Sequence, residues 1–120
     1  MLKNTSLFLL SDHGIAIPSI YYLSEFYNYE KILPMLYLLV NDRKNISYES
    51  QYKYLNENQQ AFITGFDIYN TIINLIYGDK YGTTEIENLI SKQGQSLFSH
   101  INSLNRSPKD YSSMDLFVCI

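Results

Sequence analysis

The chain of 120 residues is long enough for one domain, and its composition, 46% hydrophobic and 18% charged, is that of a folded protein rather than a disordered one. Its net charge of −3, with nine Lys and Arg residues and no basic stripe, argues against nucleic acid as the main partner. The longest apolar run, residues 33–40, is far shorter than the ~20 residues of a membrane-spanning helix, so we expect no membrane segment in this chain.

Two short apolar runs predict two strands. The first, residues 6–10, stops at the polar sequence Ser11-Asp12-His13-Gly14, and the second, residues 33–40, ends in a polar turn at 41–45. Short runs without a polar face are typical of buried strands in a parallel sheet. The segment between them, residues 15–31, has no clear periodicity and is predicted to be an irregular surface loop, the kind of loop on which α/β proteins build their sites.

The strongest helix prediction begins at Thr64. Thr64 and Asp67 fit a capping box, in which Thr64 accepts from the Asp67 backbone N–H and Asp67 reaches back. One apolar stripe follows at spacings of three and four residues: Phe66, Tyr69, Ile72, Ile73, Ile76 and Tyr77. Gly78 stands where a left-handed C-terminal cap belongs. A weaker helix is predicted from Thr84 to a stop at Gly94, and a polar helix over residues 47–58.

These elements predict an α/β fold, in which residues 1–120 form part of one domain with a mostly parallel sheet and flanking helices. Two strands do not make a stable sheet alone, so the fold is expected to be incomplete as a domain. The single cysteine, Cys119, cannot form an internal disulfide and leaves the redox compartment open.

The Asp12-His13 pair is the main candidate for chemistry. A carboxylate and an imidazole at the carboxyl end of a buried strand are well placed to bind a divalent metal, and Gly14 allows a tight turn behind them. These residues also fit a simpler arrangement, a turn in which Asp12 caps a backbone N–H and His13 lies at the surface. Both interpretations remain open from the residues alone.

Several blocks of the sequence resemble one known family. Residues 3–14 are similar to the last core strand and metal motif of the alkaline phosphatase superfamily. Further blocks follow in the family's order: Glu30 with Leu33-Pro34, Asn58 with Thr64, Asp67-Ile68 and Thr71, residues 94–98, and Asn105-Arg106. Together these blocks resemble the eukaryotic sulfatase-like family known as DUF229. The tail departs from the family, since Ser107-Pro108 stands where a cysteine is usual.

This resemblance implies that Asp12 and His13 coordinate a metal, with zinc or manganese favoured by the histidine and calcium as the alternative. It implies hydrolysis or transfer of phosphate, phosphodiester or sulfate esters, on a small-molecule, glycan or lipid substrate. Family members place the nucleophile N-terminal to this motif, so the chain is expected to be a C-terminal fragment that is inactive alone. The resemblance also points to the secretory pathway or the cell surface.

A second interpretation is a non-catalytic remnant, or a protein-interaction module, that keeps the fold pattern without the chemistry. An upstream Thr or Ser nucleophile with an acidic partner would favour the enzyme, whereas a genuine start at Met1 would favour the remnant. Two other titratable residues are expected to be structural or solvated: Asp67 as a helix cap, and His100 as a solvent-facing side chain.

Overall fold

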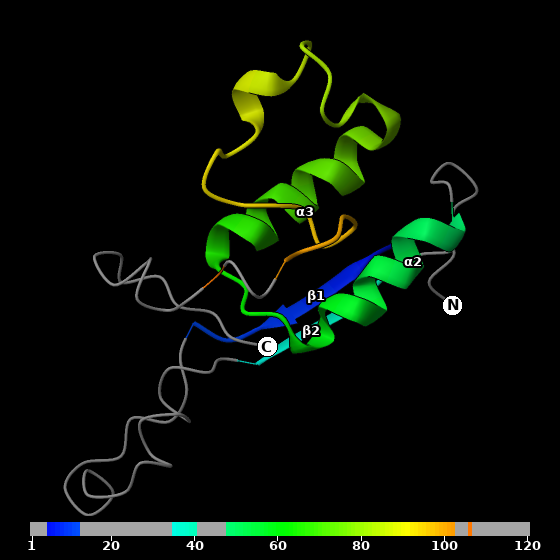
Figure 1. Ribbon diagram of the computed structural model, residues 1–120, viewed down its shortest axis with the longest axis vertical. Coiled ribbons are helices and arrows are strands. Elements are labelled where there is room, and N and C mark those ends of the chain that lie inside the picture. The colour runs from blue at the N-terminus through cyan, green and yellow to red at the C-terminus, as the bar shows by residue number, and fades with distance from the viewer. Residues whose placement is uncertain (1–4, 13–34, 41–47, 103–105, 107–120) are drawn as a thin grey trace, which may run out of the picture.

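The computed structural model describes residues 5–12, 35–40, 48–102 and 106 (Figure 1). His13, Gly14, the loop predicted at 15–31, Glu30 and Cys119 lie outside these residues. In chain order, the strands and helices are β1 (Leu7–Leu10), β2 (Leu36–Leu39), α2 (Tyr48–Glu57) and α3 (Gly65–Tyr77). Short 3₁₀ turns occupy Asn58–Gln60, Gly78–Lys80 and Glu87–Leu89. The described part therefore combines two helices with a strand pair.

The two strands pair in antiparallel orientation, with Leu7 opposite Leu39 and Leu10 opposite Leu36. We predicted strands of a mostly parallel sheet, and this pair does not have a parallel orientation. An uninterrupted apolar run indicates that a strand is apolar on both sides but does not encode its direction. The long segment between β1 and β2 also permits either direction, so the sequence held no signal that could decide between them.

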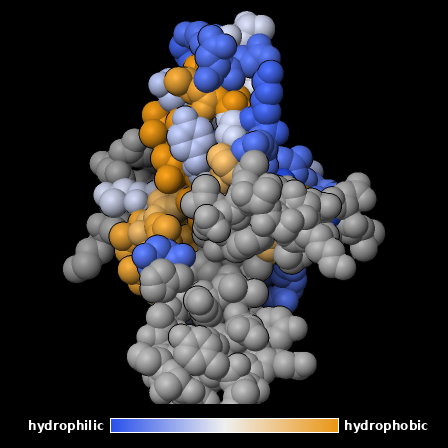
Figure 2. Space-filling view, turned by 90° about the vertical axis from the view of Figure 1, so that its left-hand side faces the viewer, coloured by the Kyte–Doolittle hydropathy of each residue, from blue (hydrophilic) through white to orange (hydrophobic). Residues whose placement is uncertain are grey.

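The faces of the strand pair differ in burial. On the inner face, Leu36 is 9% exposed, and Phe8 and Leu38 pack against the core. On the outer face, the side chains are about half exposed: Leu7, Leu9, Tyr37 and Leu39. Apolar residues accordingly appear at the surface in Figure 2. The predicted burial of β1 is thus incorrect for most of the strand.

The core lies between the inner face of the sheet and the residues around α3. Its buried members are Leu36, Ala61, Ile63, Ile68, Leu97 and Ile101, with Leu55 of α2 packed against them. Four of these residues come from irregular segments on either side of α3 rather than from a regular element. Hydrophobic burial alone does not fix the position of such segments, so polar contacts must hold them in place.

Helix α3 begins and ends as predicted. The capping box between Thr64 and Asp67 is present in both directions, and it supplies partners for the backbone groups that the first turn leaves unpaired. Gly78 ends the helix with the predicted positive φ, 54°, but its ψ of −122° is not that of a left-handed helical cap; a residue with a Cβ rarely adopts this conformation. The polar helix predicted over 47–58 is also confirmed, as α2. Within the described segments, no helix combines the length and apolarity needed to cross a membrane.

The apolar stripe of α3 is not its buried face. Ile76 is 67% exposed, and Tyr69 and Ile72 are also exposed. The side chains of Asp67, Asn70 and Thr71 are instead fully buried, at 0% exposure. Polar side chains at this depth must find hydrogen-bond partners. They find them in the segment 91–106, as described below.

The helix predicted from Thr84 to Gly94 does not form. The segment contains only the 3₁₀ turn Glu87–Leu89, and Ile86 is its buried residue at 4% exposure. Its backbone bonds run from residue i to i−3, as from Leu89 to Ile86 and from Ile90 to Glu87. Between Gly82 and Gly94 the only apolar residues are Ile86, Leu89 and Ile90. This stripe is too short to stabilise an α-helix, and the segment forms tighter turns instead.

Candidate functional site

The end of β1 is fixed to the start of β2 by two hydrogen bonds. The Ser11 N–H donates to the Met35 carbonyl oxygen at 3.0 Å, and the Met35 N–H donates to the Ser11 hydroxyl oxygen at 2.9 Å. These bonds extend the pairing one residue beyond Leu10. Asp12 is consequently the first residue after the fixed strand end, and it is exposed to solvent there.

An exposed carboxylate in this position suits a divalent metal, because carboxylate oxygens are ligands of zinc, manganese and calcium. His13 lies outside the described residues, so the structure places Asp12 alone of the predicted pair. Across residues 5–12, 35–40, 48–102 and 106, no three His, Cys, Asp or Glu side chains gather as a metal site. Asp12 and His13 would supply two ligands, and a four-coordinate site would take its other ligands from elsewhere.

The Asp67 carboxylate is buried at the first turn of α3. Its Oδ2 accepts from the Thr64 N–H at 2.7 Å, from the Thr64 hydroxyl at 2.9 Å and from Arg106 Nη1 at 2.8 Å. Its Oδ1 accepts from the Gln95 N–H at 2.6 Å. Both oxygens are bonded and the charge is paired with a guanidinium that is only 10% exposed. This carboxylate is therefore structural, as predicted, and not a general base.

Arg106 connects two parts of this network. While Nη1 binds Asp67, Nη2 donates to Gln95 Oε1 at 3.1 Å. The planar guanidinium can make two directed bonds of this kind at once, which a lysine ammonium does not reproduce. The first turn of α3 is thereby joined to residues 95 and 106 of the C-terminal segment.

Two more residues of α3 hold the same segment. Asn70 donates from Nδ2 to the Ser91 carbonyl and accepts from the Ser91 N–H, each at 2.9 Å. The Thr71 hydroxyl donates to the Asp67 carbonyl at 2.6 Å and accepts from the Leu97 N–H at 2.9 Å. Side chains of α3 thus replace the backbone partners that a neighbouring strand would offer.

Asn58 binds the far end of the segment. Its Nδ2 donates to the carbonyls of Leu97 at 3.0 Å and Ser99 at 2.8 Å, and its Oδ1 accepts from the Ile101 N–H at 3.1 Å. At 4% exposure, Asn58 has its amide hydrogens and its oxygen all engaged. Its role is to fix residues 97–101 against the core.

Sequence reasoning identified the cap and missed the network around it. Arg106 lies 39 residues from Asp67, so no local pattern links them. A signal for the rest was present: Asp67, Asn70, Thr71 and Asn74 recur at helical spacing, a polar stripe as regular as the apolar one. When a helix carries both a polar and an apolar stripe, the polar stripe can be the buried one, and its side chains then need hydrogen-bond partners inside the protein.

The environment of Tyr81 changes the pKa of its phenol. Burial raises the pKa of its phenol above the ordinary 10.0, a hydrogen bond with the Ser96 backbone acts in the opposite direction, and the charge of Asp67 raises the pKa further. The phenol is therefore held neutral beside the Asp67 network.

His100 is a surface residue, in line with its expected position. Its side chain is 64% exposed, and its Nδ1 lies 3.6 Å from Glu57 Oε2. The imidazole also lies beside the Tyr54 ring, with centroids 6.1 Å apart. An exposed pair of this kind contributes little to stability.

Comparison with known proteins gives one match. A family described as a protein of unknown function, DUF229, matches residues 1–112. Neither the curated proteins nor the solved structures gave a match. The match covers nearly the whole chain, including β1, Asp12, both helices and Arg106. The chain therefore belongs to the DUF229 family.

Proposed function

We propose that this chain is the C-terminal part of a metal-dependent hydrolase or transferase of the sulfatase and alkaline phosphatase type, acting on phosphate, phosphodiester or sulfate esters. The observation that carries the proposal is the position of Asp12, exposed directly after a strand whose end is fixed by Ser11 and Met35. Membership of DUF229 supports it, because the residues matched by that family, 1–112, include Asp12 and His13.

In this proposal Asp12 and His13 are ligands of one metal, with zinc or manganese expected and calcium the alternative. When bound, such a metal lowers the pKa of a hydroxyl nucleophile and neutralises charge on the transferred group. The nucleophile and the remaining ligands are assigned to residues outside this chain. The rest of a mostly parallel sheet is likewise assigned to residues outside this chain, and the antiparallel strand pair would form one part of that sheet.

The proposal extends to substrate and compartment. A small-molecule, glycan or lipid ester is the expected substrate, and the secretory pathway or the cell surface is the expected location. The chain alone is expected to bind metal weakly and to show no hydrolysis, because two ligands without a nucleophile cannot complete the reaction.

Calorimetric titration of zinc and manganese into the 120-residue chain tests the ligand assignment. Asp12→Asn and His13→Gln should each weaken binding by roughly 10-fold or more, since each removes one of two ligands. His100→Gln is the matched control, because it removes the other, exposed histidine. Binding of unchanged strength in both motif variants would show that the metal lies elsewhere and would refute the assignment.

The outer face of the sheet supports a second candidate, a non-catalytic interaction module. Leu7, Leu9, Tyr37 and Leu39 line an apolar hollow of about 300 Å³, and among the described residues that line it only the tyrosine carries a polar group. Surfaces of this kind are typical of interfaces. This candidate would replace the enzyme if the chain bound neither zinc nor manganese through Asp12 and His13 but still associated through this face.

A further inference from the structure

The hydrogen-bond ladder between β1 and β2 ends in an irregular pair. The register that sets Leu10 opposite Leu36 also sets Ser11 opposite Met35. In an antiparallel ladder, every second pair of opposite residues exchanges two bonds, in which each N–H donates to the carbonyl of the other residue. The Ser11 N–H makes one such bond, to the Met35 carbonyl at 3.0 Å. The Met35 N–H donates instead to the Ser11 hydroxyl, at 2.9 Å.

The Ser11 hydroxyl thus takes the place of a backbone acceptor. Serine hydroxyls compete with backbone carbonyls in this way where regular structure ends. Because Met35 donates to the hydroxyl, the Ser11 carbonyl and the peptide that joins it to Asp12 are not held by the ladder. The backbone bends at Asp12, the next residue. The side chain of Ser11 therefore ends the ladder at the residue before Asp12.

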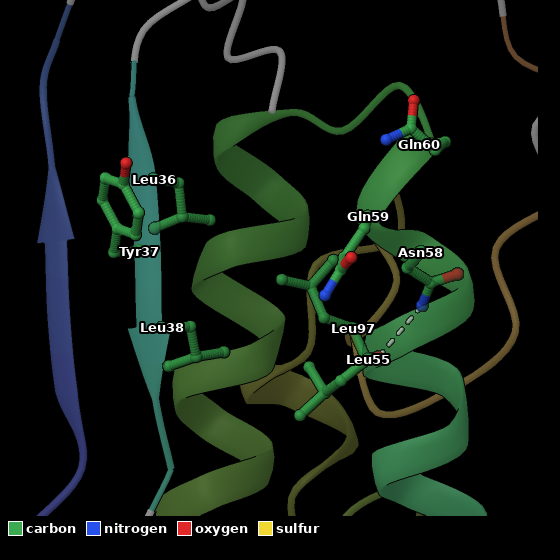
Figure 3. Close-up of a pocket in the computed structure, with 8 residues that line it drawn as sticks. All are labelled: Leu36, Tyr37, Leu38, Leu55, Asn58, Gln59, Gln60 and Leu97. Carbon is green, nitrogen blue, oxygen red and sulfur yellow. Dashed lines mark hydrogen bonds between the residues drawn. The ribbon is translucent and has the colours of Figure 1, made fainter.

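The direction of Asp12 depends on this ending. Side chains alternate between the two faces of a strand, so a continued strand would place Asp12 on the face of Phe8 and Leu10. Leu36 and Leu38, which pair with these two residues, point toward the helices and line a hollow there (Figure 3). An ionised carboxylate turned to this side would face leucine side chains in place of water, which is costly. Asp12 is instead exposed to solvent.

We propose that Ser11 is a positioning residue of the metal site. Its hydroxyl replaces its own carbonyl as the acceptor of the Met35 N–H, ends the ladder and directs the Asp12 carboxylate to solvent, where it binds the metal. Without the hydroxyl, the Met35 N–H takes the carbonyl of residue 11, the ladder lengthens by one bond and Asp12 turns toward the inner face. This inference rests on the proposed function, because it takes Asp12 as a metal ligand.

Calorimetric titration of zinc into the 120-residue chain tests the proposal. Ser11→Ala should weaken binding by roughly 10-fold or more, as removal of groups that orient metal ligands does. Ser11→Thr keeps a hydroxyl and should retain the wild-type affinity. Thr5→Ala is the matched control, because it removes an exposed hydroxyl ahead of the same strand and should change nothing. The double variant of Ser11→Ala with Asp12→Asn should bind no more weakly than Asp12→Asn alone, since Ser11 acts through Asp12.

The possible failures differ from one another. If Asp12→Asn weakens zinc binding and Ser11→Ala does not, the positioning role is refuted and the ligand assignment stands. A lower urea midpoint for Ser11→Ala with an unchanged zinc Kd would likewise show that the hydroxyl is only structural. An equal loss in Ser11→Thr would show that the hydroxyl is not the cause. If neither Asp12→Asn nor Ser11→Ala weakens binding, the proposed function fails and this inference fails with it.

An NMR measurement on the metal-free wild-type chain tests the hydrogen bond itself, whether or not the variants fold. Couplings through hydrogen bonds connect an amide nitrogen to the carbonyl carbon that accepts from it. A coupling is expected from the Ser11 nitrogen to the Met35 carbonyl carbon, and none from the Met35 nitrogen to the Ser11 carbonyl carbon. Couplings in both directions would show a regular ladder pair and would overturn the proposal.

Discussion

Asp67 and Arg106 show how a buried charge can position a chain segment without a regular element. The carboxylate is 0% exposed, and its charge is matched by a guanidinium at 2.8 Å. A buried pair of this kind adds little net stability relative to apolar residues, but removing one partner leaves an uncompensated charge. The pair therefore acts mainly by making one arrangement of residues 91–102 and 106 against α3 far more stable than the others.

Substituting Arg106→Met should destabilise the chain by about 3 kcal/mol, because the Asp67 charge stays buried without its cation. The double variant with Asp67→Asn should lose less than the sum of the single losses, since the charge is then gone. Urea unfolding followed by circular dichroism measures both. The control is Lys53→Met, whose partner Glu57 lies at 3.6 Å on the surface and whose loss should cost less than about 0.5 kcal/mol. A cost for Arg106→Met no larger than that of the control would contradict the role given to the pair.

Tyr81 predicts a pH dependence at the alkaline end. Its pKa is raised in the folded chain, so the unfolded chain releases the phenolic proton first as the pH increases. The stability contributed by this group is fully present below its ordinary pKa of 10.0 and is lost as the pH rises from that value through the higher pKa of the folded chain. Tyr81→Phe should therefore reduce the loss of stability above about pH 10, measured by urea unfolding. Identical pH profiles for the two chains would argue against a raised pKa.

Among the elements, α3 depends on a glycine in another part of the chain. A Cβ on Gly94 would collide with the Phe66 carbonyl group and lie 2.8 Å from the Asp67 nitrogen. The segment after the 3₁₀ turn thus passes directly over the first turn of α3, where only glycine fits. This close approach brings Gln95 to the Asp67 carboxylate.

Gly94→Ala should lower stability by about 2 kcal/mol or more, since backbone rather than a flexible side chain must move. Gly65→Ala is the matched control, because Gly65 has open space around its Cβ position and stands at the first position of α3. The control should be neutral or slightly stabilising. Thermal unfolding of both variants tests this, and a Gly94→Ala chain as stable as the control would mean that the contact is not tight.

The parts of the fold that were predicted correctly are those set by neighbouring residues. The capping box, the Gly78 end of α3 and the helix α2 depend on residues within a few positions of each other, so their signals are legible in the sequence. The direction of β2 and the outward orientation of Ile76 depend on contacts with distant segments. Asp12 was placed at a strand end correctly, but Arg106 could not be linked to Asp67 because their contact spans 39 residues.

At the scale of the whole molecule, most of the exposed large apolar side chains of the described residues lie on the strand pair and on α3. The outer face of the strand pair exposes Leu9 and Tyr37 at 52% and 61%, and α3 exposes Ile76 at 67%. Isolated exposed apolar residues are ordinary, but a continuous outer face of four such residues is not. The described part therefore presents an apolar outer face on the strand pair, formed by Leu7, Leu9, Tyr37 and Leu39.

The chain should accordingly self-associate as its concentration rises, and Leu9→Lys should suppress this by placing a charge in the centre of the outer face. Gln93→Lys makes the same change in charge at an exposed polar position and should leave association unchanged. Sedimentation velocity over a range of concentrations distinguishes the two. A wild-type chain that stays monomeric throughout would indicate that this face does not drive association.

The hydrogen bonds of the segment 91–101 predict an unusual pattern of amide hydrogen exchange. Its backbone N–H groups at Ser91, Gln95, Leu97 and Ile101 donate to side chains of Asn70, Asp67, Thr71 and Asn58. Amide hydrogens bound to buried acceptors exchange slowly whatever the local backbone conformation. A hydrogen-exchange map should thus show these four amides protected as strongly as those of α3, and exchanging together with them. In hydrogen exchange, the segment 91–101 would therefore behave like a hydrogen-bonded strand beside α3, although it contains no regular strand.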